Sequence, residues 1–213
     1  MVVGVGFALM LATLALFGLL AEDVVEHEPI PLDASANGAL HRSATPALDA
    51  VMNVITTLGT TPVLAVIVLA AVVALLRVRR VREAVFLAVV SVGSSALTEL
   101  LKRAFVRPRP ALPWAMPIAS YSFPSGHALG SLACYGALAL VVWRVWGRRW
   151  GTVAVGGAAL LALAIGLSRV YLGVHYVSDV IGGYAAATCW VSGAATATAA
   201  RRAFPRREQR SGC

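Results

Sequence analysis

The chain has 213 residues, of which 59% are hydrophobic and 13% are charged, and it carries a formal net charge of +8. Soluble domains usually contain about 25% charged residues, so this composition excludes an ordinary soluble protein and favours a membrane protein. The basic residues lie mostly in short clusters between apolar runs. The positive charge therefore indicates membrane topology and contact with anionic headgroups, and does not indicate nucleic-acid binding.

Six apolar segments are long enough to cross a bilayer, which requires about 20 residues of helix. Runs of this length fit helices and not barrel strands, so we expect an all-α bundle of six transmembrane helices. The first segment lacks a basic leading region and is longer than the apolar part of a usual signal peptide, which favours a retained span. The predicted spans are residues 2–21, 57–76, 84–101, 127–145, 153–172 and 177–199.

Arginine clusters mark one side of the membrane. They occupy residues 77–82, residues 144–149 and a basic tail over residues 200–213. The positive-inside rule makes these regions cytoplasmic, and an even number of spans then places both termini inside. We therefore expect a multi-pass protein of the cell membrane that forms one domain over residues 1–213.

Two connections face outward in this topology. Residues 22–56 are acidic, and residues 45–58 could form a short interfacial helix; whether this connection covers a site stays open. Residues 102–124 instead carry four cations on the side where the rule disfavours them, which suggests anion binding. These cations are Lys102, Arg103, Arg107 and Arg109.

A first group of candidate residues follows the third predicted span. Lys102 is the only lysine in the chain. Arg109 lies seven positions after it and is followed by Pro110. A compact ammonium and a planar guanidinium both suit phosphate oxygens.

A second group opens the fourth predicted span with Pro124, Ser125, Gly126 and His127. Proline is well placed at a helix start, Ser125 can cap the helix, and Gly126 permits close approach of a ligand to the backbone. The free N–H groups and positive dipole of a helix N-terminus suit a phosphate oxygen. An ordinary helix cap with an interfacial histidine is the alternative interpretation of this motif alone.

A third group joins the last two predicted spans and contains Ser168, Arg169, His175 and Asp179. His175 and Asp179 are four residues apart, so on a helix they would share a face. The carboxylate can then fix the imidazole tautomer and leave the other nitrogen free to attack. The alternatives are a pair that merely stabilises the helix end and, for Arg169, a side chain that snorkels to the interface.

Together the three groups resemble the signature of the type 2 phosphatidic acid phosphatase superfamily, which includes vanadium haloperoxidases and glucose-6-phosphatases. The resemblance is direct over residues 102–179, and order and internal spacing agree. It implies that His175 is the nucleophile that forms a phosphohistidine, that Asp179 orients it, and that His127 is the general acid and base. It also implies that phosphate oxygens are held by Lys102, Arg109, Ser125, Gly126 and Arg169.

The resemblance further implies an enzyme without a metal or another cofactor. The three cysteines, an odd number without a spacing pattern, likewise argue against a zinc site. The expected substrate is a membrane lipid with a phosphate or diphosphate headgroup, hydrolysed at the outer face. Undecaprenyl diphosphate, phosphatidic acid and phosphatidylglycerol phosphate are family substrates, and the sequence does not select among them or indicate an oligomeric state.

Two other functional classes compete with this interpretation. A non-catalytic transporter or binding protein for lipid phosphates would also place charges in membrane spans, but it would need cations across the membrane depth. The cations of this chain instead cluster at one end of the predicted spans. A haloperoxidase would use the same pocket for vanadate, but six predicted spans argue against that class.

Overall fold

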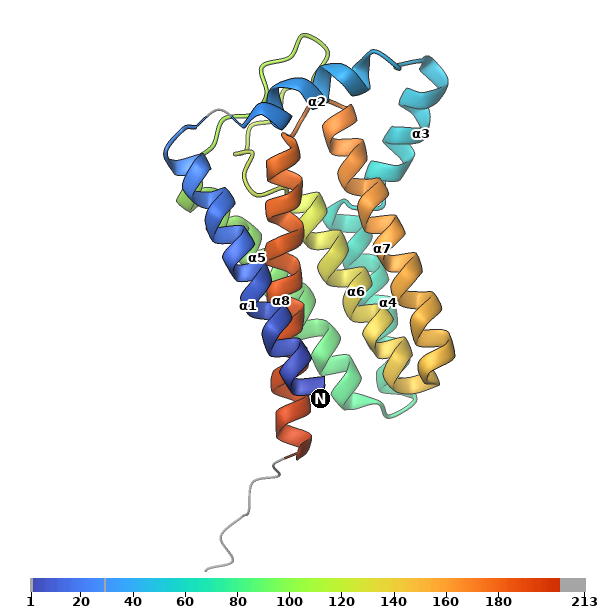
Figure 1. Cartoon of the computed structure of the whole chain (residues 1–213). Coiled ribbons are helices and arrows are strands. Elements are labelled where there is room, and N and C mark those ends of the chain that lie inside the picture. The colour runs from blue at the N-terminus through green and yellow to red at the C-terminus, as the bar shows by residue number, and fades with distance from the viewer. Residues whose placement is uncertain (1, 29, 204–213) are drawn as a thin grey trace, which may run out of the picture.

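The computed structural model describes residues 2–28 and 30–203, and these residues form eight helices and no strand (Figure 1). An all-helical architecture was predicted, and it is confirmed over the described residues. The basic tail lies, from residue 204 onward, outside them. The helices are α1 (Val2–Val25), α2 (Pro31–His41), α3 (Pro46–Thr57), α4 (Thr61–Arg77), α5 (Val81–Phe105), α6 (Gly126–Trp146), α7 (Arg148–Tyr171) and α8 (Val177–Ala203).

The predicted number of six spans is not confirmed. Among the described residues, four helices (α1, α5, α6 and α7) are long and apolar enough to cross a membrane. A fifth span results if α3 and α4, which meet at a 47° bend, count as one. Helix α4 alone has only 17 residues. Helix α8 has 27 residues and is long enough to cross a membrane. It is not apolar enough to count among these helices, because serine, threonine and glycine recur along it.

Helix α6 lies at the centre of the bundle and contacts α4, α5, α7 and α8, while α1 packs along α8 (Figure 1). The buried core between α5, α6 and α8 combines large side chains of α5 with small side chains of the other two helices. Phe86, Leu87 and Val90 of α5 thus pack against Ala133 and Ala137 of α6. Small residues let helix backbones approach closely, which is the usual way that helices associate in lipid.

Glycine is required where α8 passes the start of α6. A Cβ atom at Gly183 would lie 2.8 Å from the backbone oxygen of Ser125 and 3.0 Å from Cβ of Ala128. This close approach fixes the distance between α8 and the start of α6, which carries the second motif. A Cβ atom at Gly156 or Gly157 of α7 would instead meet open space.

The connection between α1 and α4 is largely helical and covers one end of the bundle. Helix α2 crosses the ends of α7 and α8, and α3 then leads down to α4 (Figure 1). The helix expected over residues 45–58 is α3, and the Thr45 side chain caps it by accepting from the backbone N–H of Leu48 at 3.2 Å. The end of the bundle that α2 and α3 cover, called the capped end below, also carries all three sequence motifs.

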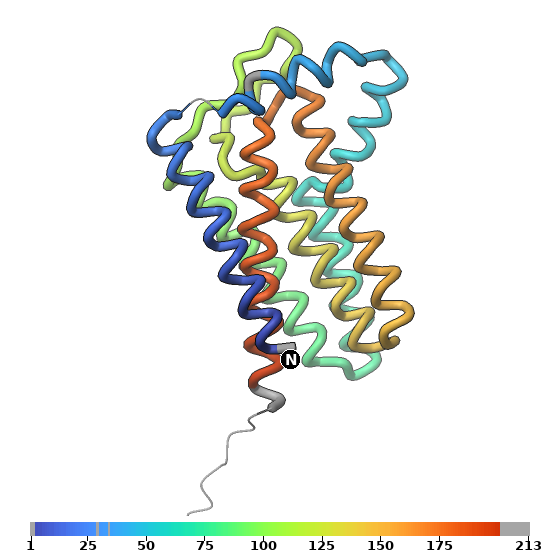
Figure 2. Tube along the Cα trace, in the orientation of Figure 1, coloured from blue at the N-terminus to red at the C-terminus, as the bar shows by residue number. Residues whose placement is uncertain are grey.

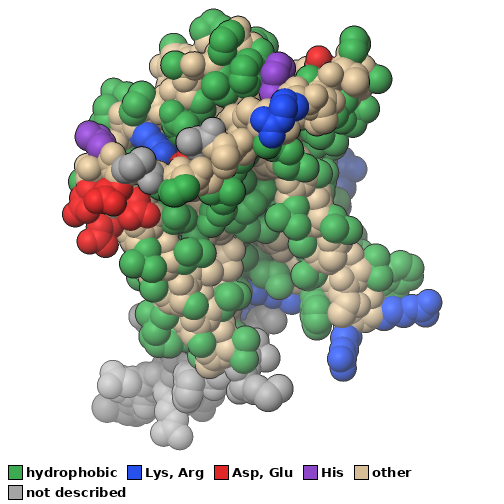
Figure 3. All heavy atoms as spheres, turned by 45° about the horizontal axis from the view of Figure 1, so that its top comes forward, with side chains coloured by type: hydrophobic (Ala, Val, Ile, Leu, Met, Phe, Trp, Pro, Cys, Tyr) green, Lys and Arg blue, Asp and Glu red, His purple; other side chains and the backbone are tan. Residues whose placement is uncertain are grey.

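The opposite end holds the start of α1, the end of α8 and the α4–α5 and α6–α7 connections (Figure 2). Hydrophobic side chains cover much of the flank between the two ends (Figure 3). Acidic side chains gather where α1 ends, at Glu22, Asp23, Glu26 and Glu28 (Figure 3). Multi-pass membrane insertion is consistent with this distribution, because an apolar flank separates two polar ends.

Candidate active site

His175 lies in the short connection between α7 and α8, at the capped end of the bundle. Its side chain is 2% exposed, and its Nδ1 lies 3.3 Å from Oδ2 of Asp179, which is fully buried. The predicted pairing of the two residues is thus present, but they do not share a helical face. Helix α8 begins only at Val177, and Asp179 in its first turn reaches back to the preceding segment, where it also accepts from the backbone N–H of Tyr176 at 2.8 Å.

The second imidazole nitrogen of His175 faces a cation. Nη1 of Arg109 lies 3.1 Å from Nε2, and a guanidinium can only donate, so Nε2 is the acceptor and Nδ1 carries the proton toward Asp179. Burial lowers the pKa of His175 to about 4, with Asp179 opposing and Arg109 and Arg169 reinforcing that shift. The imidazole is therefore neutral at pH 7, with its free lone pair on Nε2.

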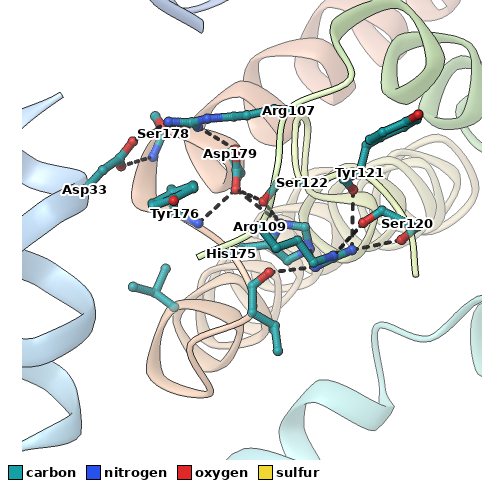
Figure 4. A network of polar contacts seen from close by, with 12 residues as sticks. Asp33, Arg107, Arg109, Ser120, Tyr121, Ser122, His175, Tyr176, Ser178 and Asp179 are labelled. Carbon is teal, nitrogen blue, oxygen red and sulfur yellow. Dashed lines mark hydrogen bonds and ion pairs between the residues drawn. The ribbon is translucent and has the colours of Figure 1, made fainter. Parts of the chain in front are cut away.

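Arg109 is fixed by backbone carbonyls on two sides. It donates to the Ser120 oxygen at 2.7 Å and to the Val174 oxygen at 2.6 Å, so the guanidinium bridges the connection between α5 and α6 and the His175 segment (Figure 4). Such a guanidinium has little freedom to move away from the imidazole.

The second motif begins helix α6, as predicted, with Ser125 at the N-cap. Its hydroxyl makes no capping hydrogen bond, is buried and has no partner, so the expected cap is wrong. The side chain also lies outside the cavity wall, whereas Gly126 and His127 are part of that wall. By helix geometry the first N–H groups of α6 have no intrahelical acceptor. Nε2 of His127 is buried and also lacks a partner.

Lys102 and Arg169 complete the predicted set. Lys102 in the last turn of α5 donates from Nζ to the backbone oxygen of Tyr121. Arg169 is buried near the end of α7, where Nη1 donates to Oγ1 of Thr56 at 2.8 Å, while Nε has no partner. The side chain therefore does not snorkel outward. Ser168 donates to a backbone oxygen of its own helix and serves packing.

One cavity of about 700 Å³ brings these residues together. Both histidines line the same cavity. Asp179 lies behind His175 and not on the wall, as an orienting carboxylate would. The predicted residues on the wall are Lys102, Arg109, Gly126, His127, Arg169 and His175.

The same cavity continues between α4, α5 and α6 as an apolar arm. Leu64, Val68 and Val72 of α4 face Ala88 and Val92 of α5 across it. The lining is thus polar where the three motifs meet and mainly apolar along the helices, with the hydroxyl groups of Ser91 and Ser95 on α5 between the apolar side chains. An amphiphilic molecule matches this division, because its headgroup and hydrocarbon chain need opposite environments.

Two of the four outer cations do not contribute to the cavity. Arg107 pairs with Asp179 and Asp33, and Arg103 pairs with Glu99 at 2.7 Å in an exposed ion pair. The anion-binding interpretation of this loop thus applies to Lys102 and Arg109 only.

Two residues that contact the predicted site, Ser122 and Thr56, were not identified from sequence. Ser122 is fully buried, donates to Oδ2 of Asp179 and lies 3.3 Å from Nδ1 of His175 (Figure 4). Thr56 accepts from Arg169. For Ser122 the only sequence signal was its polar side chain two positions before the Pro124 motif. No feature of the sequence pointed to Thr56.

Comparison with known proteins agrees with this geometry. Residues 83–203 match the family model described as PAP2 superfamily. Phosphatidylglycerophosphatase B of Bacillus subtilis is 31% identical over 156 residues, which cover 70% of this chain and 77% of that protein. Lipid A 1-phosphatase of Rhizobium etli is 38% identical over 106 residues, which cover 44% of this chain and 41% of that protein.

Two crystal structures share the fold. The first transmembrane PAP2 type phosphatidylglycerolphosphate phosphatase from Bacillus subtilis superposes with a TM-score of 0.82 at 24% identity, covering 93% of this chain and 98% of its own. Aquifex aeolicus LpxE gives a TM-score of 0.61 at 24% identity, covering 80% and 98%. Because the family match spans more than half of the chain, and the Bacillus relative is matched over most of its length, this chain belongs to the PAP2 superfamily.

Proposed function

We propose that this chain is a membrane phosphatase that hydrolyses the phosphomonoester or diphosphate headgroup of a lipid through a phosphohistidine on His175. The observation that carries the proposal is the convergence of His127, His175 and three cations on one cavity with an apolar arm. The relatives compared are named as phosphatases of phosphatidylglycerophosphate and of lipid A. None of them supports the transporter alternative.

The first chemical step is attack of Nε2 of His175 on phosphorus. The lone pair on Nε2 forms the N–P bond, the P–O bond to the lipid breaks, and His127 gives its proton to the leaving oxygen. Asp179 keeps the Nδ1 proton in place and balances the positive charge that develops on the imidazole.

Phosphoryl transfer depends mainly on in-line positioning and on stabilising the equatorial oxygens. Lys102, Arg109 and Arg169 supply fixed positive charge, and the N-terminus of α6 at Gly126 supplies N–H donors. Ser125, which was expected to hold a phosphate oxygen, has a buried hydroxyl outside the cavity wall, so in this proposal only the backbone of the helix end takes part. These groups can stabilise the transferring phosphoryl without a metal or another cofactor.

The second step regenerates the enzyme. His127, now neutral, takes a proton from water, whose oxygen attacks phosphorus, and the N–P bond breaks to return the electron pair to His175. Inorganic phosphate then leaves. His127 lines the cavity, and its buried Nε2 has no hydrogen-bond partner, which supports a role as the acceptor of this proton.

The proposed substrate is amphiphilic, and its hydrocarbon part would occupy the arm between α4, α5 and α6. In the proposed topology six spans cross the bilayer, with α3–α4 as one and α8 as another, so that both termini are cytoplasmic. Arginines at residues 77–82 and 148–149 lie at the end opposite the site, which supports an outer-face active site.

Phosphate release by the detergent-solubilised protein tests this function. The panel should contain phosphatidylglycerol phosphate, phosphatidic acid, undecaprenyl diphosphate and lipid A, with His175→Ala as the blank. We expect release from at least one lipid by the wild type and none by the blank. Equal release by both proteins, or none from any lipid by a folded wild type, would refute the proposal.

A further inference from the structure

Helix α2 lies across the end of the bundle directly over the segment that carries His175 (Figure 1). It sends two polar side chains inward: Asp33 is 5% exposed and Asn37 is 3% exposed. Buried polar side chains are costly unless they are paired, so their partners indicate what the helix holds. Their partners lie at the end of α7, in the connection that carries His175, at the start of α8 and at Arg107.

Asn37 holds the backbone on both sides of this connection. Its Nδ2 donates to the backbone oxygen of Val170 at 3.0 Å and to the backbone oxygen of His175 at 3.1 Å. The end of α7 and the His175 segment are thereby tied to one amide group.

Asp33 holds the start of α8. Its Oδ1 accepts from the backbone N–H of Ser178 at 2.9 Å, and its Oδ2 accepts from the hydroxyl of the same residue. Oδ2 also accepts from Nη2 of Arg107 at 2.9 Å (Figure 4).

Arg107 continues the chain of contacts toward His175. Its Nη1 donates to Oδ1 of Asp179 at 2.6 Å, so one guanidinium bridges two buried carboxylates. The other oxygen of Asp179 accepts from Ser122, from the backbone of Tyr176 and from His175. Because each oxygen has its own donors, the plane of the carboxylate that orients the imidazole is fixed from both sides.

Charge also makes Arg107 necessary in this position. Asp33 and Asp179 together bring two negative charges into a buried region, and removing the guanidinium would leave both without their shared cation. The Arg107 side chain is 14% exposed, lies outside the cavity wall and packs with its guanidinium 4.3 Å from the ring centroid of Tyr176. Its position therefore fits a partner of carboxylates and not a phosphate ligand.

We propose that Arg107 and Asp33 are positioning residues for the nucleophile, which act through Asp179 and do not touch the substrate. The inference rests on the proposed function, and it gives the 22–56 connection a role: α2 anchors the catalytic segment from the outside. It predicts a loss of turnover without a loss of phosphate affinity, since the groups proposed to hold phosphate remain in place.

The test compares Arg107→Gln and Asp33→Asn with wild type by kcat, KM and the inhibition constant of inorganic phosphate. We expect kcat to fall at least tenfold in each variant, with KM and the phosphate inhibition constant within threefold of wild type. Arg103→Gln, which removes a neighbouring exposed cation, and Glu26→Gln, which removes an exposed carboxylate, are the matched controls and should retain wild-type kcat.

Three further variants separate positioning from stability and from phosphate binding. Arg107→Lys keeps the charge but cannot bridge both carboxylates with a planar fork, so its kcat should fall between those of wild type and Arg107→Gln. Arg109→Gln should instead raise KM and the phosphate inhibition constant. The double variant Asp33→Asn/Arg107→Gln should lose no more kcat than the worse single variant, because both changes break one chain of contacts.

A folded Asp33→Asn or Arg107→Lys protein with wild-type kcat would overturn the inference. It would also be overturned if Arg107→Gln raised the phosphate inhibition constant by the same factor by which it lowers kcat. Thermal unfolding of each purified variant establishes folding, and the isosteric Asp33→Asn decides the question if Arg107→Gln does not fold. Failure of wild type to release phosphate from any lipid would refute the proposed function, whereas an active wild type with equally active variants refutes the positioning role alone.

Discussion

Acidification offers a quantitative test of the proposed nucleophile. An ordinary histidine titrates near 6.5, but burial lowers the pKa of His175 to about 4. At pH 5.5 a group with a pKa of 4 is about 97% neutral, whereas one with a pKa of 6.5 is about 9% neutral. Because only the neutral imidazole attacks, the structure predicts roughly tenfold more active nucleophile at this pH than an unperturbed histidine would supply.

The sign of the shift fixes the direction of the pH profile. A lowered pKa keeps the nucleophile active as pH falls through 6.5 and removes activity only as pH approaches about 4. On the alkaline side we expect kcat to fall where the enzyme–substrate complex loses the proton that His127 must give to the leaving oxygen, which gives kcat a bell-shaped profile.

The assay is kcat/KM from pH 4 to 9 in detergent micelles, since this quantity reports ionisations of the free enzyme and free substrate. The ionisation of the substrate is separated from that of the enzyme by comparing a lipid phosphate with an aryl phosphate, whose phosphate groups lose their second proton at different pH. The enzyme ionisation must appear at the same pH with both substrates. A shared acid limb centred near 6.5 would refute the assignment of His175 as a buried, neutral nucleophile.

Three further outcomes are expected. His175→Ala should abolish both phosphate release and the acid-labile phosphoenzyme, measured with radiolabelled substrate; residual turnover above a few per cent would contradict the nucleophile. Asp179→Asn should lower kcat by at least a hundredfold and change KM little, because it removes the charge and the acceptor that fix the imidazole tautomer; an unchanged kcat would exclude an orienting role. Treatment with EDTA should leave the rate intact, because protein cations stabilise the phosphoryl oxygens; activity lost and then restored only by added metal would point to another mechanism.

Helix positions were predictable from sequence because membrane spans are long and their backbone must satisfy its own hydrogen bonds. The ends of α5, α6 and α7 lie within a few residues of the predicted spans, apart from the earlier start of α7 at Arg148. One continuous span was expected over residues 57–76, but helix α3 ends at Thr57 and helix α4 begins at Thr61. A Cβ atom at Gly59, within this break, would lie 2.5 Å from Ile165 and 3.1 Å from His127. Such a tertiary constraint leaves no periodic signal along the chain.

The motif residues were predictable for a different reason. Each motif places reactive groups at or next to the end of a helix, and at the start of α6 the helix also leaves N–H donors free. Contacts between distant segments carry no such local pattern. Thr56 reaches Arg169 across 113 positions in sequence, and Asn37 reaches His175 across 138. Only the assembled bundle identifies these partners.

The two arginines at positions 107 and 109 show how far spacing alone can mislead. Charge and proximity suggested that both bind anions, and alternate residues of an extended segment would share one side. In the fold they contact different members of the His175–Asp179 pair. Arg107 donates to the carboxylate of Asp179, and Arg109 faces Nε2 of His175. A cation at the carboxylate stabilises the orienting anion, whereas a cation at Nε2 lies where phosphate oxygens must bind. In the proposed mechanism, equal charges two residues apart therefore have different roles, orientation for Arg107 and substrate binding for Arg109, and the difference between kcat and KM effects on their replacement separates the two roles.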